Sequence, residues 1–258
     1  MNLFVLLKMV PDTVEELELA ADGTALDSAA LRFKLSDPDE HALEEALILK
    51  ERHGGKVTVV ALNSPELDDV LHTALAKGAD RAVRLAVDQT ALGSVATAKV
   101  FADFFKSGAV AITPDTLLLP GAQAYDDLEG EVAPYLAGAL QMPYVGVVCS
   151  VKPISGKVVA VKEFSGGRRG EFELPLPAVL GIQSAEKPPR YVPIAKVMAM
   201  RRTARIETVN VPAPERPAAV SVARMYKPEV AAHAQMLEGS PEEVAERIAG
   251  LLAERGLI

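Results

Sequence analysis

Residues 56–85, KVTVVALNSPELDDVLHTALAKGADRAVRL, contain the pattern that decides the fold. The apolar runs at 56–62 and 81–85 are typical of strands, and apolar residues between them recur at helical spacing over 65–77. A turn at 78–80 joins the helix to the second strand. A strand, a helix and a strand connected by short turns predict two parallel strands with a right-handed crossover.

The same alternation extends on both sides of this unit. LFVLLKMV at 3–10 is a continuous apolar run, typical of a strand that is buried on both faces. A helix is expected from Ser36, where an early proline and acidic residues are start signals, to the stop at Gly54-Gly55. Further on, we expect a helix over 90–105, a strand over 116–119 and a helix over 127–140. The chain therefore predicts an α/β fold with an open, mostly parallel, doubly wound sheet.

The second part of the chain has a different character. Strands are expected at 145–152, 158–164, 170–174 and 175–182, the first three as hairpins. They are followed by an extended proline-rich segment at 188–193, a short helix at 194–200, irregular structure over 203–238 and a helix from Ser240 to about Arg255. We therefore divide the chain into an α/β core, residues 1–185, and a C-terminal arm and helix, residues 186–258, which would wrap onto a partner subunit.

The composition excludes several classes of protein. The 258 residues carry a net charge of −8, which argues against a nucleic-acid-binding protein, because such proteins show a clustered basic face. No apolar run approaches the length of a transmembrane helix, and the N-terminal apolar run lacks the features of a signal peptide. The single cysteine, Cys149, excludes an internal disulfide framework and fits a reducing cytoplasm. Four scattered histidines give no metal-site spacing.

Ligands in open α/β sheets bind at the carboxyl ends of the strands, where three loops of this chain are expected. These loops are residues 8–13, 63–65 and 120–130. The last, PGAQAYDDLEG, is the strongest candidate, because Gly121 permits close approach of a ligand and a helix start offers free N–H groups to an anion. The chain contains neither the dinucleotide fingerprint GxGxxG nor a P-loop.

The acidic residues of this loop support a second interpretation. Asp126, Asp127, Glu129 and Glu131 would stabilise a helix start by about 0.3–1 kcal/mol each, and they would repel a phosphate. The Asp126-Asp127 pair fits capping better than catalysis, because adjacent residues point apart. From the residues alone, ligand binding and helix capping both stay open.

Other candidate side chains also have open roles. Lys8 would either face a ligand or be solvated, and Tyr125 would either stack on a base or pack. Asp37, Asp39 and Glu40 fit the start of a helix. No Ser/His/Asp or Cys/His constellation can be assembled, so no self-contained catalyst is expected.

Residues 162–202, KEFSGGRRGEFELPLPAVLGIQSAEKPPRYVPIAKVMAMRR, combine a hairpin, an apolar strand and a basic, proline-rich arm. The arm is expected to carry an apolar patch flanked by arginines, made of Ile194, Val197, Met198 and Met200. A monomer rarely exposes such a patch, so the arm predicts a surface for a partner protein. The alternative is that the arm folds back on its own core.

Six segments, the arm among them, resemble the β subunit of electron transfer flavoproteins over essentially the full length of the chain. They are LKMVPDT (7–13), SDPDEHALEEALILKE (36–51), ALAKGADRAVRL (74–85), LLLPGAQAYDD (117–127), the hairpin and strand at 163–185, and EKPPRYVPIAKVMAMRR (186–202). The last two are the most specific, because the others fit many α/β nucleotide-binding proteins.

The resemblance implies a heterodimer. In this family an α subunit holds most of the contacts to a redox-active FAD, while the β subunit contributes to the flavin environment and usually buries an AMP. The complex takes electrons from flavin dehydrogenases and passes them to a membrane quinone oxidoreductase or another acceptor. We therefore expect FAD as a shared cofactor, an α subunit as the permanent partner, and the dehydrogenases and the oxidoreductase as transient partners.

The resemblance also assigns residues. The cofactor-binding residues that it implies are Leu6, Lys8, Ser36, Asp37, Pro38, Asp39, Asn63, Gly121, Ala122, Gln123, Ala124, Tyr125, Asp126, Asp127, Gly130 and Val132. The partner-binding residues that it implies are Tyr191, Ile194, Val197, Met198 and Met200. Ile194 stands at the place of an anchoring leucine in the family, and the loops around Thr13 and Pro38 would lie nearest the flavin.

The chain departs from the family at the expected phosphate site. Gly130, Glu131 and Val132 stand where family members with AMP commonly have Asn or Gln and Thr. This change removes side-chain donors and adds a negative charge, so we predict weak or absent AMP binding, with backbone amides as the remaining anion donors. Thr13 and Pro38 replace aromatic residues that are common near the flavin.

Two alternative functions remain. The segment VPDT at 10–13 resembles bifurcating members of the family, in which a second FAD occupies the AMP position and accepts hydride from NADH. From a different class, the chain would be a stand-alone adenine-nucleotide-binding regulator built on the same core. That interpretation gives the arm at 186–202 no role.

Overall fold

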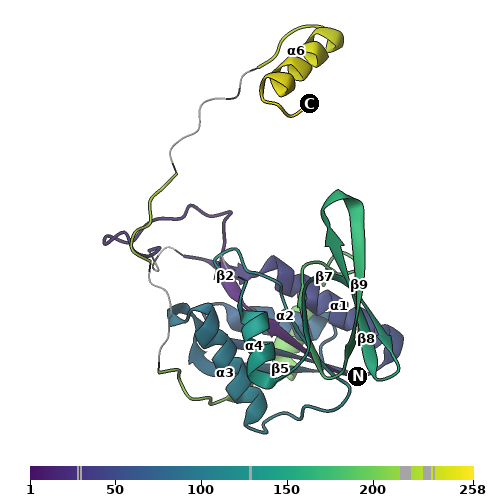
Figure 1. Cartoon of the computed structure of the whole chain (residues 1–258). Helices are drawn as coiled ribbons and strands as arrows, with labels where there is room; N and C mark the ends of the chain where they lie inside the picture. The colour runs from purple at the N-terminus through teal and green to yellow at the C-terminus, as the bar shows by residue number, and fades with distance from the viewer. Residues whose placement is uncertain (28, 30, 128–129, 216–221, 229–233, 235) are drawn as a thin grey trace.

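A nine-stranded sheet forms the centre of the molecule in this computed structural model (Figure 1), which describes residues 1–27, 29, 31–127, 130–215, 222–228, 234 and 236–258. Its strands are β1 (Asn2–Leu7), β4 (Lys56–Asn63), β5 (Arg81–Asp88), β6 (Thr116–Pro120), β7 (Tyr144–Ile154), β8 (Lys157–Phe164), β9 (Arg168–Pro175), β10 (Ala178–Ile182) and β11 (Glu207–Val209). The order across the sheet is β11-β5-β4-β1-β6-β10-β7-β8-β9. All pairings are parallel except those of the hairpins β7–β8 and β8–β9, as the sequence predicts.

Helices cover both faces of this sheet. The helices that pack on it are α1 (Asp37–His53), α2 (Leu67–Lys77), α3 (Ser94–Lys106) and α4 (Val132–Leu140). Helix α5 (Ile194–Thr203) lies along α2, and α6 (Pro241–Glu254) covers neither face. Side chains of β1 alternate between the two faces, with Leu3 and Val5 packing in the cluster of α1 and α2, and Phe4 in the cluster of α3 and α4. The open, doubly wound α/β fold expected from the sequence is confirmed.

Helix α1 follows its start signals closely. Ser36 occupies the N-cap position, a proline lies in the first turn, and Gly54 ends the helix with a φ of 73°. The Ser36 hydroxyl makes no capping hydrogen bond, so the first turn is stabilised by its acidic residues and its packing instead. In contrast, Ser240 and Glu243 form a capping box at the start of α6, where the sequence predicts that a helix begins.

The structure corrects the start of one predicted helix and adds strands that were not predicted. Helix α4 begins at Val132 and not at residue 127, and Glu131 occupies its N-cap position. Residues 203–238 were expected to be irregular, yet β11 adds a parallel strand beside β5 and is fixed by two hydrogen bonds between Arg81 and Glu207. A short antiparallel ribbon of β2 (Met9–Pro11) and β3 (Phe33–Leu35) was also not expected.

The described residues after β11 lie outside the compact α/β body. The Met225 N–H donates to the Gly23 carbonyl, and Lys227 pairs with Glu16 and Glu18, all three partners lying in the segment between β2 and β3. Helix α6, drawn in yellow in Figure 1, stands apart from the sheet, and none of its residues is buried. The division of the chain at residue 186 stays a prediction. No helix in the described ranges is long and apolar enough to cross a membrane.

A buried glutamate of α1 joins three parts of the fold. The Glu45 carboxylate is about 1% exposed and accepts hydrogen bonds from the Val151 N–H of β7 and the Glu186 N–H that follows β10, both at 3.0 Å. Burial raises the pKa of Glu45, against the two N–H donors that lower it. The carboxylate therefore satisfies two backbone donors that would otherwise lack a partner.

We expect Glu45→Ala to lower the free energy of unfolding by about 2–4 kcal/mol, because it leaves two backbone N–H groups without their acceptor. Urea denaturation of the full chain would measure this loss. Glu173→Ala is the control, since Glu173 pairs with Lys157 at the surface with half of each side chain exposed, and should cost less than about 1 kcal/mol. Equal losses in both variants would contradict the role given to Glu45.

Candidate functional site

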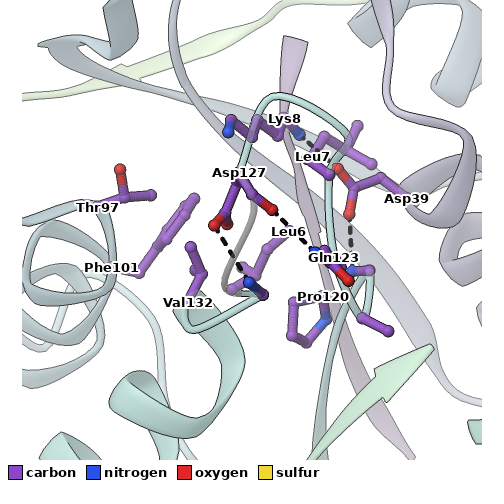
Figure 2. Close-up of a pocket in the computed structure, with 14 residues that line it drawn as sticks. Leu6, Leu7, Lys8, Asp39, Thr97, Phe101, Pro120, Gln123, Asp127 and Val132 are labelled. Carbon is purple, nitrogen blue, oxygen red and sulfur yellow. Dashed lines mark hydrogen bonds between the residues drawn. The ribbon is translucent and has the colours of Figure 1, made fainter. Parts of the chain in front are cut away.

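A hollow opens at the carboxyl ends of β1 and β6 (Figure 2), where the sequence predicts a ligand site. Its cavity volume is about 40 Å³, far below the range of roughly 300–1,000 Å³ that is usual for ligand pockets. The residues that line it are Leu6, Leu7, Lys8, Asp39, Thr97, Phe101, Pro120, Gly121, Ala122, Gln123, Ala124, Asp127, Gly130 and Val132. The hollow is therefore formed by two strand ends, the start of α1, one face of α3 and the loop before α4.

Asp39 is the best-anchored polar side chain of the hollow. It lies in the first turn of α1, and its carboxylate accepts the Lys8 N–H at 2.9 Å and the Gly121 N–H at 2.7 Å. These two amides follow the ends of the neighbouring strands β1 and β6. A single carboxylate thus fixes both loops against α1, as the dashed lines in Figure 2 show.

Gly121 is required by this close approach. A Cβ atom at this position would lie 2.4 Å from the Asp39 Oδ1 atom and 2.9 Å from the Pro38 Cβ atom. The glycine predicted to admit a ligand therefore admits a carboxylate of the chain itself.

Burial dominates the electrostatics of Asp39. It raises the pKa of this carboxyl to about 7, while the N–H groups of Lys8 and Gly121 and the Lys8 charge lower it. Asp126 raises the pKa of Asp39 further through its negative charge.

Lys8 is paired and not simply solvated. Its ammonium group donates to the Asp126 Oδ1 atom at 2.7 Å, with about a quarter to a third of each side chain exposed. Tyr125 beside this pair donates its hydroxyl to the Pro11 carbonyl, and the Lys34 ammonium lies 5.9 Å from its ring centroid. Of the two interpretations of Tyr125, this arrangement matches packing.

Asp127 caps a turn of the loop and not the helix. Its carboxylate accepts the Gly130 N–H at 3.2 Å, and its own carbonyl accepts the Gln123 side-chain amide at 3.2 Å. Gly130 has a φ of 63°, in the left-handed region that glycine tolerates best. Asp127 is only 7% exposed, and both of these contacts are made by residues that precede α4.

The structure brings together most of the residues assigned from the sequence. Leu6, Lys8, Asp39, Gly121, Ala122, Gln123, Ala124, Asp127, Gly130 and Val132 line the hollow. Ser36, Asp37, Pro38, Asn63, Tyr125 and Asp126 lie outside its lining. The structure adds Leu7, Thr97, Phe101 and Pro120. The sequence could have indicated Thr97 as a site residue, because it is a polar residue on the face of α3 that is otherwise apolar and buried.

Two buried hydroxyls lie near this edge of the sheet. Ser36 precedes α1 and Ser64 follows β4, and they are 1% and 9% exposed. Among the described residues, neither hydroxyl oxygen has a hydrogen-bond partner. Within the same ranges, no group of histidine, cysteine and acidic side chains could hold a metal ion.

The arm is attached to the core by its first residues. The backbone N–H of Arg190 and two of its guanidinium nitrogens donate to Glu44 of α1, whose side chain is 5% exposed. The third guanidinium nitrogen pairs with Glu51. Further along, Arg201 pairs with Asp69 of α2. These contacts hold α5 along α2.

The predicted partner-binding residues divide between two sides of the arm. Tyr191, Ile194 and Met198 are 83%, 75% and 43% exposed. Val197 and Met200 are half-buried, and Met200 packs against the core cluster of α1 and α2. The arm therefore folds back on its core along one side and leaves an apolar side uncovered in this chain.

Comparison with known proteins identifies the family. The sequence pattern described as "Electron transfer flavoprotein domain" matches residues 24–214. The chain is 32% identical over 268 residues to the "Electron transfer flavoprotein subunit beta" of Methylophilus methylotrophus, covering 98% of both chains. The chain belongs to the family of electron transfer flavoprotein β subunits.

Two further relatives show the breadth of this family. The β subunit of the electron transfer flavoprotein of Syntrophomonas wolfei is 33% identical over 252 residues, covering 96% of this chain and 95% of its own. The "Acryloyl-CoA reductase electron transfer subunit gamma" of Anaerotignum propionicum is 29% identical over 201 residues, covering 77% and 73%. The resemblance found in the sequence is confirmed.

The pKa of Asp39 makes a testable prediction for this β subunit. Because the pKa of about 7 in the folded chain lies above the usual value of 3.8 for a free aspartate, Asp39 contributes stability that is fully present below the lower value and is lost as the pH rises through the higher one. Asp39→Asn removes this dependence. The difference in unfolding free energy between the natural chain and Asp39→Asn should therefore be larger at a pH near 5 than at a pH near 8.

Chemical denaturation at both pH values would measure this difference, and other titrating groups cancel in the comparison. A difference that grows with pH would mean that the two N–H donors and Lys8 outweigh burial at Asp39.

Proposed function

We propose that this chain pairs with an α subunit that holds FAD, and that the complex carries electrons from flavin dehydrogenases to a quinone oxidoreductase or another acceptor. The observation that carries the proposal is the uncovered apolar side of the arm, formed by Tyr191 just before α5 and by Ile194 and Met198 of α5. Aromatic residues and methionine are enriched in protein interfaces, and this patch projects from a core that belongs to an electron-carrier family.

The arm is suited to brief encounters because its base is fixed. The contacts of Arg190 with Glu44 and Glu51 and of Arg201 with Asp69 hold both ends of the segment. A surface that is ordered before binding loses less conformational entropy when a partner arrives. An electron carrier must release one partner before it meets the next, and a small apolar patch favours weak, short-lived complexes.

We assign the α-subunit interface to the hairpins at the opposite edge of the sheet. Strands β8 and β9 expose the aromatic rings of Phe164 and Phe172, and the β7–β8 turn exposes Ile154. Exposed aromatic residues on an edge hairpin support an interface with another subunit. Helix α6 exposes Ile248 and Leu251 and would pack on the same partner, as the division of the chain at residue 186 supposes.

The flavin would be held mainly by the α subunit, with this chain supplying one wall of its site. The proposed wall is formed by Thr13, which follows β2, and by Pro38, in the first turn of α1 after β3, and β2 pairs with β3. FAD supplies the one- and two-electron chemistry, and the residues of this chain position and shield it. We place the complex in the cytoplasm, where a single free cysteine, Cys149, stays reduced.

The two alternative functions receive less support. A bifurcating complex needs a second FAD at the hollow beside Asp39, and the carboxylates there oppose a pyrophosphate. The name of the relative from Anaerotignum propionicum concerns electron transfer to a reductase and does not require a second flavin here. A stand-alone regulator would leave the exposed apolar side of α5 without a use.

We expect Ile194→Glu to slow electron acceptance from a flavin dehydrogenase. A charge at the centre of the patch should raise the apparent KM of the dehydrogenase for the complex by roughly tenfold to a hundredfold, the range of interface hot spots. The unfolding free energy should stay within about 0.5 kcal/mol, because Ile194 is 75% exposed. Steady-state reduction of the complex, with the complex as varied substrate, would measure the KM.

Tyr135→Glu is the matched control, since Tyr135 is a 46% exposed aromatic residue of α4, away from the arm. Its KM should equal that of the natural chain. An unchanged KM in Ile194→Glu, or a loss of several kcal/mol in its stability, would contradict the role of the arm.

A further inference from the structure

A nucleotide phosphate needs donors, and three N–H donors of the loop that lines this hollow already have acceptors. Anion sites at strand ends depend on backbone N–H groups and on cationic side chains. The Gly121 N–H donates to Asp39, the Gly130 N–H to Asp127, and the Ala122 N–H to a carbonyl of β10 at 2.7 Å. Three donors of the loop that would enclose a phosphate are thus used within the chain.

The lysine of the hollow is also neutralised. Lys8 lies 2.7 Å from an Asp126 oxygen, and it is the cationic residue of the lining. Asp39 and Asp127 add carboxylates to the same lining, both less than a tenth exposed. Like charges about 4 Å apart repel by about 4 kcal/mol at the effective dielectric constant of a protein surface. Each of these carboxylates therefore opposes a phosphate when it is ionised, which for Asp39 is about half of the molecules near pH 7, because burial raises its pKa to about 7.

The start of α4 does not supply donors in place of the N–H groups and the lysine that are already paired. The first three N–H groups of a helix are free to bind an anion, but Pro134 is the third residue of α4 and has no N–H group. Glu131 occupies the N-cap position and brings a negatively charged residue to the helix start, although its side chain makes no capping hydrogen bond. Val132, the first helical residue, has no hydroxyl to offer.

We infer that the carboxylates of Asp39, Asp126 and Asp127 take the structural place of a nucleotide phosphate in this subunit, so that the hollow accepts neither AMP nor the adenylate half of a second FAD. The chain holds its own loops with internal anions and assembles without a nucleotide. What remains between these groups is a small space lined by Leu6, Phe101 and other apolar side chains. A complex built with this subunit then carries a single flavin.

Two measurements test this inference on the purified full-length chain. Heat denaturation followed by chromatography of the supernatant should release no AMP and no FAD from the chain, and calorimetric titration with AMP should give a Kd weaker than about 1 mM. Stoichiometric nucleotide in the supernatant, or a Kd tighter than this limit, would overturn the inference. Neither measurement needs an α subunit, so the result is separate from the success of the proposed function.

Variants that restore donors should create binding. Asp126→Asn frees Lys8 and removes one charge, and the double variant Glu131→Gln/Val132→Thr adds side-chain donors beside the helix start. Each should tighten AMP binding by at least about tenfold, the effect of one ordinary hydrogen bond or charge contact. Thermal unfolding would establish that both variants are folded, and the double variant carries the test if Asp126→Asn is not.

Asp103→Asn is the matched control. Asp103 pairs with Lys99 on the surface of α3, also at 2.7 Å, so the variant loses the same kind of pair and the same charge away from the hollow. It should leave AMP binding as weak as in the natural chain. Equal AMP binding in Asp103→Asn and in the folded pocket variants would overturn the inference, because the carboxylates of the hollow would then not be what excludes the nucleotide.

Discussion

The buried carboxylate of Asp39 is the interaction on which the carboxyl edge of this sheet depends. Parallel strands end at a common edge, and the first N–H group after each strand needs an acceptor there. Asp39 supplies one carboxylate to two such groups, those of Lys8 and Gly121, and so joins β1, β6 and the start of α1. Other sheets of this type use the same edge to hold a ligand. Here the edge is held by the chain.

Helix α1 extends this arrangement to the rest of the molecule. Asp39 lies at its start, Glu44 and Glu45 in its middle, and Arg52 in its last turn. Glu44 accepts the N–H of Arg190 at the beginning of the arm, and Glu45 accepts an N–H of β7. Arg52 pairs with Glu186. Helix α1 therefore holds the loops that line the hollow and also holds the beginning of the arm. A buried charge is costly unless it is well paired, and each of these glutamates accepts at least two donors.

Local patterns in the sequence were enough for the layers of the fold. The apolar runs of β1 and β4 and the spacing of Leu71 and Ala74 place strands and helices correctly, because burial of one face depends on the period of the segment itself. The family could also be recognised, because the segment at 186–202 is specific. Short elements were not predicted. Strand β11, for example, spans Glu207–Val209 and is defined by its pairing with β5, which no local pattern of the sequence indicates.

The contacts that decide the site were beyond the sequence for the same reason. Asp39 has the appearance of an ordinary residue at a helix start, yet one of its partners, Gly121, is 82 positions away. Arg190 and Glu44 are 146 positions apart. Asp127 fits a helix cap by type, but its partner is the glycine three residues later, so the helix begins further on. The departures at Glu131 and Val132 were visible, because they needed only a comparison of residue types.

The flavin content of the assembled complex tests the central claim most directly. The chain would be co-expressed with a candidate α subunit, purified through a tag on this chain, and analysed by visible spectrum and by chromatography of the released cofactors. The account predicts a 1:1 complex with one FAD and no AMP. A chain that purifies alone without flavin, or a complex with two flavins, would contradict it.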